Sequence, residues 1–345
     1  MSKQLQTSRP SKKPLRLVLI GKTGAGKSKT GNVILNNDTH FQCASQGSSL
    51  TQVCKSSDAI VSENWVTIVD TPGLFDTKKN NQEILDEITK CIWMTAPGPH
   101  AFLFVVRIGR FTTEDLSTLE LFVKHFGENI FKFMVVIFAH YDDWKRDGVN
   151  DHSDIKDFVK TLSLKLQNII KNKCKDRIVA FDNTLKGFES RSQVSELMSI
   201  IDVMNKSNMK DENEYYSNGD YKKAHVVIQK EVMMEKYNLE RQCFREEAKM
   251  QRQIEEATDE KVKKSLAKKQ DECRLKWKER LNETNIQRNV QRQPVRIIVL
   301  KNVLEIGSAG LGVLGDIIPG PVGIGFKIAA TVAGIFSNIF NSIYK

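Results

Sequence analysis

The stretch LVLIGKTGAGKSKTGN, residues 17–32, passes from an apolar run into glycines and then into a lysine and a serine. It contains the spacing GxxxxGK[ST] between Gly21 and Ser28. Glycines allow successive backbone N–H groups to point inward around phosphate oxygens, because no Cβ atom is in the way. A helix that begins at Lys27 presents its positive end to the same oxygens. The stretch therefore predicts a phosphate-binding loop between a buried strand and a helix.

The residue types of this loop suggest a nucleoside triphosphate with Mg²⁺. We expect Lys27 to reach the β- and γ-phosphates and the Ser28 hydroxyl to bind the metal ion. A chance glycine turn is the alternative, but the position directly after a strand and at the start of a helix favours a nucleotide site. The candidate cofactor-binding residues of the loop are Gly21, Lys22, Thr23, Gly24, Ala25, Gly26, Lys27, Ser28 and Lys29.

A second motif, VTIVDTPGLFD at residues 66–76, ends an apolar run in an aspartate. Asp70 leaves the strand where it could hold Mg²⁺ through water, and the Gly73 N–H could bind a γ-phosphate. An aspartate at the end of a strand is often only a cap or turn residue. Its combination with the phosphate loop is more specific than either motif alone and predicts nucleoside triphosphate binding.

The base-reading residues are expected in VVIFAHYDDW, residues 135–144, and in IVAFDN, residues 178–183. GTPases read guanine with a carboxylate that accepts hydrogen bonds from N1–H and the 2-amino group. Either Asp142 or Asp143 could supply it, while His140 and Tyr141 stand where GTPases usually have Asn and Lys. Asn183 follows the later strand and could contact the base through its amide. ATP binding stays a remote alternative.

The chain alternates short apolar runs with stretches of helical length. The runs are residues 15–20, 66–69, 101–106, 133–138 and 178–181, and the helical patterns include 81–94, 113–126 and 155–171. Such runs are typical of strands buried on both faces. Their alternation with helices predicts an α/β fold, with a mostly parallel sheet covered by helices, over residues 15–205.

Four further segments differ in composition from this domain. We expect a disordered N-terminus at 1–14, a linker at 206–221, a charged helical extension at 222–294 and a tail at 295–345. The extension mixes both signs of charge and lacks the aromatic interleaving that stacks nucleic-acid bases, so we expect no nucleic-acid partner. A solvated helical surface accounts for it better.

The tail is rich in glycine and apolar residues, with the sequence PGP at 319–321. Neither uninterrupted piece reaches the ~18 apolar residues of a simple transmembrane helix, and the prolines break a helix. We expect it to associate with an anionic membrane, because Lys301, Lys327 and Lys345 flank its apolar residues. A span, a hairpin insertion and a soluble lid or oligomer contact all remain open.

Bulk composition narrows the class of protein. The formal net charge of +10 suits an acidic partner such as a nucleotide, nucleic acid or membrane surface. The six cysteines form no CxxC pair, which argues against a zinc site and for free thiols in a reducing compartment. The polar N-terminus has no secretory signal, and Ser2 stands where myristoylation needs glycine. We therefore expect a cytoplasmic protein on the cytosolic face of an intracellular membrane.

The segment TAPGPHAFLFVVRIGRFTTED, residues 95–115, resembles the one that marks the immunity-associated GTPases, the GIMAP family. These proteins are relatives of septins and of the chloroplast outer-envelope import GTPases. SLTQVCK at 49–55 and FDN at 181–183 are also similar to that family. The resemblance covers residues 15–205 and implies a P-loop GTPase domain that binds GTP or GDP with Mg²⁺.

The resemblance implies roles for particular residues. Thr51 would be the switch threonine that closes on Mg²⁺ when the γ-phosphate is present, together with Ser28 and Asp70. Asp143 would read guanine, with His140 in place of the usual first residue of that motif. The resemblance also implies homodimers or homo-oligomers formed through the GTPase domain, in which Arg110 would reach the partner's phosphates as a catalytic residue.

Hydrolysis is expected to be slow without a partner. Ras-like enzymes orient the attacking water with a glutamine directly after the DxxG glycine, and this chain has Leu74 there. Two hypotheses follow. One is a membrane-associated GTP switch or scaffold that assembles when GTP-bound, and the other is an active GTPase whose turnover is stimulated by dimerisation.

Overall fold

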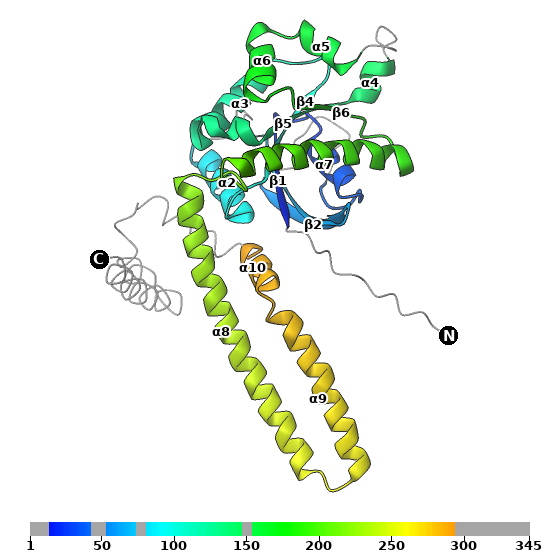
Figure 1. Ribbon diagram of the computed structural model, residues 1–345, viewed down its shortest axis with the longest axis vertical. Helices are drawn as coiled ribbons and strands as arrows, with labels where there is room; N and C mark the ends of the chain where they lie inside the picture. The colour runs from blue at the N-terminus through cyan, green and yellow to red at the C-terminus, as the bar shows by residue number, and fades with distance from the viewer. Residues whose placement is uncertain (1–13, 43–52, 74–80, 147–153, 294–345) are drawn as a thin grey trace, which may run out of the picture. The chain divides into compact units, whose positions relative to one another are not determined.

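The computed structural model describes residues 14–42, 53–73, 81–146 and 154–293 (Figure 1). Four of the expectations above concern residues outside these ranges. They are the disordered N-terminus, of which only residue 14 is described, the roles of Thr51 and Leu74, and the membrane association of the tail at 295–345. The chain divides into two compact units, Met1–Tyr221 and Lys222–Lys345. Each unit is described by itself below.

The first unit alternates strands and helices along most of its length. Its strands are β1 (Leu15–Ile20), β2 (Lys55–Val61), β3 (Asn64–Asp70), β4 (Ala101–Arg107), β5 (Met134–Ala139) and β6 (Ile178–Phe181). Its α-helices are α1 (Lys27–Ile34), α2 (Asn81–Thr95), α3 (Thr113–Phe126), α4 (Tyr141–Arg146), α5 (Ile155–Thr161), α6 (Leu164–Asn168) and α7 (Gly187–Lys210). Two short turns of other helix types are η1 (Glu128–Phe133) and η2 (Ile169–Lys173).

The strands form one six-stranded sheet in the order β2-β3-β1-β4-β5-β6. All neighbouring pairs are parallel except β2 with β3. β1 lies in the middle, with Leu19 opposite Asp70 of β3 and Ile20 opposite Phe104 of β4. The predicted α/β fold with a mostly parallel sheet is therefore confirmed, and the strands that carry the motifs end at one edge of the sheet.

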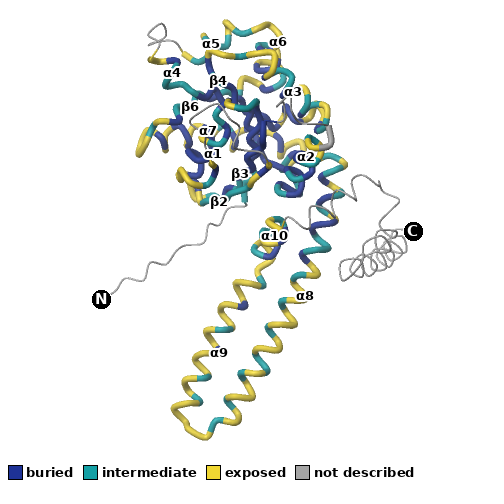
Figure 2. Tube along the Cα trace, turned by 180° about the vertical axis from the view of Figure 1, so that it is seen from behind, coloured by how far each residue is buried: buried dark blue, intermediate teal, exposed yellow. Residues whose placement is uncertain are grey.

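Helices cover both faces of the sheet, and the core follows the alternation of side chains along each strand (Figure 2). On one face, Leu17 and Leu19 of β1 belong to a cluster with apolar residues of α1 and α7. On the other face, Phe102 of β4 packs against Phe126 of α3 and against Tyr216. Burial of the sheet between two helical layers is what a doubly covered parallel sheet requires.

Two local expectations need correction. The strand β2 was not expected, because its sequence KSSDAIV is mostly polar and only Val61 is buried. The pattern at 155–171 does not form one helix, since the backbone is extended at Leu162 and Ser163 between α5 and α6. The Gln167 side chain donates hydrogen bonds to the carbonyl oxygens of Lys160 (3.0 Å) and Leu162 (2.7 Å) there, which gives these two carbonyl groups a partner at the end of α5.

The residues expected as a linker, 206–221, pack against the first unit instead. α7 continues to Lys210, and Tyr216 and Tyr221 are among the largest fully buried side chains. The Tyr216 N–H donates to the carbonyl of Pro99 (2.9 Å), and the Tyr221 hydroxyl lies 2.8 Å from the hydroxyl of Thr95. Aromatic burial therefore makes this segment part of the core.

The described part of the second unit is helical, as predicted. It contains α8 (Gly219–Glu256), whose first turn lies in the first unit, α9 (Glu260–Arg280) and α10 (Glu283–Gln291). α8 and α9 run antiparallel side by side (Figures 1 and 2). Trp277 is buried and donates from Nε1 to Glu246 (2.9 Å), and Arg274 pairs with Glu247 (3.2 Å). Polar contacts and one buried aromatic thus join the two helices.

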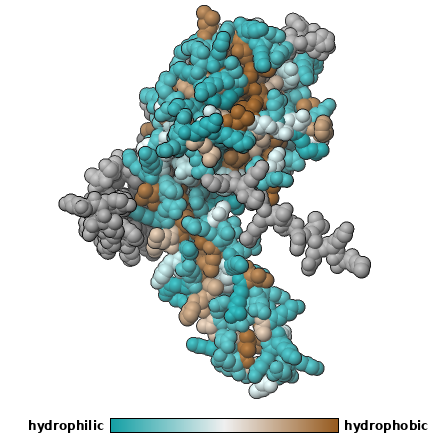
Figure 3. Space-filling view, viewed as in Figure 1, coloured by the Kyte–Doolittle hydropathy of each residue, from teal (hydrophilic) through white to brown (hydrophobic). Residues whose placement is uncertain are grey.

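The surface of this hairpin is mostly hydrophilic, with apolar side chains exposed along it (Figure 3). Val226, Met233, Tyr237 and Phe244 of α8 are exposed and recur at intervals of seven, four and seven residues, which places them on one helical stripe. No helix among the described residues has the length and apolar character needed to cross a membrane.

The burial of Tyr216 leads to a stability prediction. Replacing it with alanine should lower the free energy of unfolding of the first unit by about 3–5 kcal/mol, the usual cost of removing a buried aromatic ring. Urea denaturation of the full chain measures this. Tyr237→Ala, which removes an exposed ring, is the matched control and should change stability by less than about 0.5 kcal/mol. Equal effects of the two variants would show that residues 206–221 are not part of the core.

Candidate functional site

The glycine loop after β1 has the backbone that its sequence predicts. Gly21 has a φ of 146°, and a Cβ atom there would lie 2.3 Å from the carbonyl oxygen of Val105 in β4. Gly24 (φ 77°) and Gly26 (φ 99°) are in the left-handed region. A side chain at Gly21 would therefore force the loop away from β4, and the two other turns favour glycine for conformational reasons.

Lys27 lies across this loop at the start of α1. Its side chain is nearly buried, and its ammonium donates to the carbonyl oxygens of Gly21 (2.9 Å) and Lys22 (2.8 Å). Ala25, in the middle of the loop, is fully buried, and its N–H donates to the carbonyl of Lys22 (3.3 Å). Lys29 is exposed in the first turn of the helix. The carbonyl oxygens of the loop thus hold the Lys27 ammonium. A phosphate oxygen in the loop could replace them as its hydrogen-bond acceptor.

Ser28 and Asp70, the predicted metal ligands, lie together. The Ser28 hydroxyl donates to Asp70 Oδ2 at 2.7 Å, and Asp70 is almost completely buried at the end of β3. A hydroxyl and a carboxylate are oxygen ligands of the kind that Mg²⁺ prefers. The residues present therefore fit a magnesium ion beside the phosphate loop.

The segment after β3 meets the loop directly. A Cβ atom on Gly73 would lie 1.9 Å from the Thr23 hydroxyl oxygen and 2.7 Å from the Thr23 backbone nitrogen. The Thr71 hydroxyl donates to the carbonyl of Leu19 (2.6 Å), which joins the end of β3 to β1. Gly73 is therefore needed for the close approach of this segment to Thr23. The contact of its N–H with a γ-phosphate stays a prediction of the motif.

The predicted base-reading residues approach the loop from its other side. A Cβ atom on Gly26 would lie 3.5 Å from both His140 Nε2 and Asn183 Nδ2. Asn183 is buried after β6, and its amide nitrogen donates to the Thr30 hydroxyl of α1 (3.1 Å). The fold thus brings His140 and Asn183, which are more than forty positions apart in the sequence, to Gly26 of the phosphate loop.

Asp143 is surrounded by positive and titratable groups. Its carboxylate accepts from Arg107 (2.9 Å) and from Arg146, and lies 3.3 Å from His140 Nδ1. Burial alone would raise the pKa of Asp143, but His140 and the two arginines outweigh it, so that pKa is lowered. Burial and the Arg107 charge lower the pKa of His140. We therefore expect an ionised Asp143 beside a neutral His140 at pH 7.

Tyr141, in the position of the lysine of a usual GTPase motif, turns towards its own helix. Its ring stacks on Trp144 with centroids 5.5 Å apart, and the Lys145 ammonium lies 4.6 Å from the centre of the Tyr141 ring. Burial raises the pKa of the Tyr141 hydroxyl. The ring is therefore engaged within α4.

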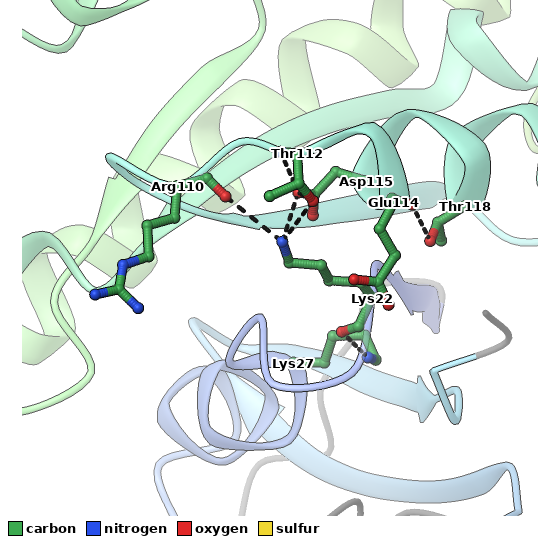
Figure 4. A network of polar contacts seen from close by, with 7 residues as sticks. All are labelled: Lys22, Lys27, Arg110, Thr112, Glu114, Asp115 and Thr118. Atoms are coloured by element: carbon green, nitrogen blue, oxygen red, sulfur yellow. Dashed lines mark hydrogen bonds and ion pairs between the residues drawn. The ribbon is translucent and has the colours of Figure 1, made fainter. Parts of the chain in front are cut away.

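Arg110 is exposed in the turn between β4 and α3. Its carbonyl oxygen lies 3.5 Å from the ammonium of Lys22, and its guanidinium points away from that contact (Figure 4). Two contacts near the site were not anticipated: the pairing of Arg107 with Asp143, and that of Lys22 with Asp115 (2.8 Å). The sequence offered one signal for the contact of Arg107 with Asp143. Arg107 is the last residue of β4, and β4 pairs with β5, which directly precedes the segment that carries Asp143.

The fold and this site together define an α/β protein of the phosphate-loop class. The central strand β1 of a mostly parallel sheet ends in a glycine turn, and a lysine begins the helix that follows. A hydrogen-bonded serine and aspartate lie beside this turn.

The chain belongs to the AIG1 family, whose family model matches residues 15–236. It is 33% identical over 199 residues to immune-associated nucleotide-binding protein 8 of Arabidopsis thaliana, covering 56% of this chain and 54% of that protein. It is 32% identical over 199 residues to GTPase IMAP family member 8 of Mus musculus, covering 57% and 28%. The chain thus spans about half or less of the length of these two relatives.

A longer alignment joins the chain to immune-associated nucleotide-binding protein 7 of Arabidopsis thaliana, at 27% identity over 303 residues, 81% of this chain and 92% of that protein. Among solved structures, Toc33 from Arabidopsis thaliana in complex with GDP and Mg²⁺ matches with a TM-score of 0.43 and 18% identity, covering 56% of this chain and 85% of that chain.

Proposed function

We propose that the protein binds GTP and GDP with Mg²⁺ and acts as a GTP-dependent switch. The observation that carries this proposal is the convergence of three groups on the loop between β1 and α1. Lys27 lies across the loop, Ser28 and Asp70 lie beside it, and His140 and Asn183 flank Gly26. Membership of the AIG1 family and the names of the relatives, which include a GTPase and nucleotide-binding proteins, support it.

Guanine is the base that the site favours. An ionised carboxylate accepts hydrogen bonds from N1–H and the 2-amino group of guanine, whereas adenine offers no such pair. Asp143 is the proposed reader, because its contact with His140 joins it to the residue that borders the phosphate loop. Asp142 remains the alternative reader. The Asn183 amide supports the base from β6.

Mg²⁺, when bound, would neutralise charge on the β- and γ-phosphates. Ser28 and Asp70 would hold it, and Thr51 is proposed to join them when GTP is present. Gly73 and the loop residues would hold the phosphate oxygens through backbone N–H groups. Since Leu74 has no group that orients water, hydrolysis by a single copy is proposed to be slow.

Catalysis, in this proposal, requires a second copy of the chain. Arg110 is exposed beside the phosphate loop, where it could cross a dimer interface and stabilise charge on the partner's phosphates. Two outcomes remain: a scaffold that assembles with GTP and hydrolyses little, and a GTPase stimulated by dimerisation. The dependence of turnover on protein concentration separates them.

The tail at 295–345 is proposed to bring the protein to the cytosolic face of an intracellular membrane. Its apolar, glycine-rich sequence with flanking lysines supports association with an anionic surface.

Nucleotide selectivity tests the guanine assignment. The wild type should bind GDP and GTP and bind ATP poorly, as measured by calorimetry with Mg²⁺. Asp143→Asn should lose about 1.5–3 kcal/mol of guanine affinity per charged hydrogen bond removed and should gain preference for xanthine nucleotides. Asp142→Asn is the matched variant, and a larger effect there would assign the reading to Asp142. Equal affinity of the wild type for ATP and GTP would contradict guanine recognition.

Lysine removal tests the phosphate site separately. Lys27→Ala should abolish measurable GTP binding, because it removes the charge aimed at the β- and γ-phosphates. Lys124→Ala, which removes an exposed lysine of α3, should bind as the wild type does. Retention of GTP affinity in Lys27→Ala would exclude the proposed site.

Specific activity against protein concentration tests Arg110. An arginine supplied by a partner can raise the rate about 10³–10⁵-fold, so turnover per molecule should rise with concentration in the wild type. Arg110→Ala should flatten that rise and leave GDP affinity unchanged, while Lys124→Ala should retain it. Turnover that is independent of concentration and survives Arg110→Ala would exclude a catalytic role, and near-zero turnover throughout would favour the scaffold.

Deletion of residues 295–345 tests the tail. The shortened chain should still bind GDP but should no longer float with liposomes that contain anionic lipids, because it lacks the apolar segment. The full chain should float, and less so at high salt. Absence of flotation by the full chain would leave a soluble lid or oligomer contact as the account of the tail.

A further inference from the structure

The side chain of Lys22, the second residue of the phosphate loop, points out of the loop and towards α3 (Figure 4). Its ammonium donates to Asp115 Oδ2 (2.8 Å), to the Thr112 hydroxyl (2.9 Å) and to the carbonyl oxygen of Arg110 (3.5 Å). All three acceptors lie within residues 110–115, which are 88 to 93 positions from Lys22 in the sequence. Lys22 therefore holds the segment that carries Arg110.

Asp115 is a fully buried carboxylate that depends on this lysine. Its Oδ2 also accepts from the backbone N–H and the hydroxyl of Thr112, both at 2.9 Å, in the capping box of α3. Its Oδ1 is buried without a hydrogen-bond partner. Among the described residues, Lys22 is the cation that pairs with the carboxylate, through Oδ2. Loss of Lys22 would leave a buried charge uncompensated, which proteins tolerate poorly.

Lys22 also contacts the lysine that is aimed at phosphate. The Lys27 ammonium donates to the backbone carbonyl of Lys22 (2.8 Å), so two direct contacts lead from Lys27 through Lys22 to the carbonyl of Arg110. A phosphate that draws the Lys27 ammonium towards itself would weaken its bond to the Lys22 carbonyl. Such a difference in contacts between the empty and the occupied loop is what allows a ligand to shift a neighbouring segment.

We propose that Lys22 and Asp115 are a positioning pair that fastens the segment 108–112 to the phosphate loop and so couples occupation of the loop to the position of Arg110. The fastening of 108–112 is inferred from the contacts of Lys22 alone. The effect on hydrolysis also rests on the proposed function, in which Arg110 acts on a partner's phosphates. Helix capping alone does not account for the pair, because Lys22 lies outside α3 and contacts residues on both sides of the helix start.

Hydrogen exchange on the full chain tests the structural part and needs no catalytic activity. In nucleotide-free protein, Lys22→Met should raise exchange of the backbone amides of 108–112 by about tenfold or more, as expected for local opening of a released segment. Lys22→Arg, which keeps the charge, should restore slow exchange. The matched control is Glu120→Gln, which breaks the exposed ion pair of α3 with Lys165 and should leave 108–112 unchanged.

The double variant Lys22→Met/Asp115→Asn covers the case in which Lys22→Met does not fold. It removes both members of the buried pair, so it leaves no uncompensated charge, and it should still show fast exchange at 108–112. Slow exchange at 108–112 in the folded double variant would overturn the proposal. Faster exchange confined to 112–116 would also overturn it, because the Thr112 N–H belongs to the helix cap and that pattern indicates loss of the cap alone.

Turnover tests the coupling to Arg110. Asp115→Asn should reduce the rise of specific activity with protein concentration, and it should cause no further loss when Arg110 is already alanine. Its GDP affinity should equal that of the wild type. Independent, multiplicative losses from Asp115→Asn and Arg110→Ala would show that Asp115 does not act through Arg110. Failure of the wild type to bind GDP would reject the proposed function, whereas binding without stimulation would favour the scaffold. In both cases the exchange results would still decide the positioning pair.

Discussion

The structure depends on a glycine at the end of β1, where the chain turns at a position that has no room for a side chain. Gly21 approaches the carbonyl of Val105 so closely that no Cβ atom fits, and this brings the loop down onto the edge of the sheet. Because β3, β4, β5 and β6 run in the same direction as β1 or its parallel neighbours, their carboxyl ends meet there too. The proposed functional residues in the described part of the chain lie at these carboxyl ends or in the segments that follow them. This is the side of an open α/β sheet on which ligands bind.

The charged side chains around the loop have polar partners within the protein. Asp70 accepts from Ser28, Asp115 pairs with Lys22, and Asp143 pairs with Arg107 and Arg146. Lys27 is held by carbonyl oxygens. A bound nucleotide would therefore exchange contacts that already exist instead of filling an unprepared site. By replacing such contacts, a phosphate could change the position of segments that it does not touch. The turn that carries Arg110 is one such segment, because Lys27 contacts Lys22 and Lys22 contacts the carbonyl of Arg110.

The two units differ in what stabilises them. The first buries two helical layers on a sheet and extends its core to Tyr216 and Tyr221, beyond the last strand and α7. The described part of the second is a helical hairpin with a mainly exposed surface, joined by contacts such as those of Trp277 and Arg274. Burial of apolar area is the main favourable term in folding, and in the first unit it is concentrated on the two faces of the sheet.

The sequence by itself determined the fold class, the strands that carry the motifs and the phosphate loop. Apolar runs buried on both faces and a glycine spacing are local signals, and both appear in the structure as predicted. It missed β2, whose polar residues lack that signal at the edge of the sheet, and it misread 206–221, because isolated tyrosines in a polar segment do not reveal what they pack against. Only the tertiary structure decided the pairing of Asp143 with Arg107 and of Lys22 with Asp115. Arg107 lies 36 residues from Asp143, and Asp115 lies 93 from Lys22, so these pairs exist only because parallel strands bring the ends of distant segments to one edge.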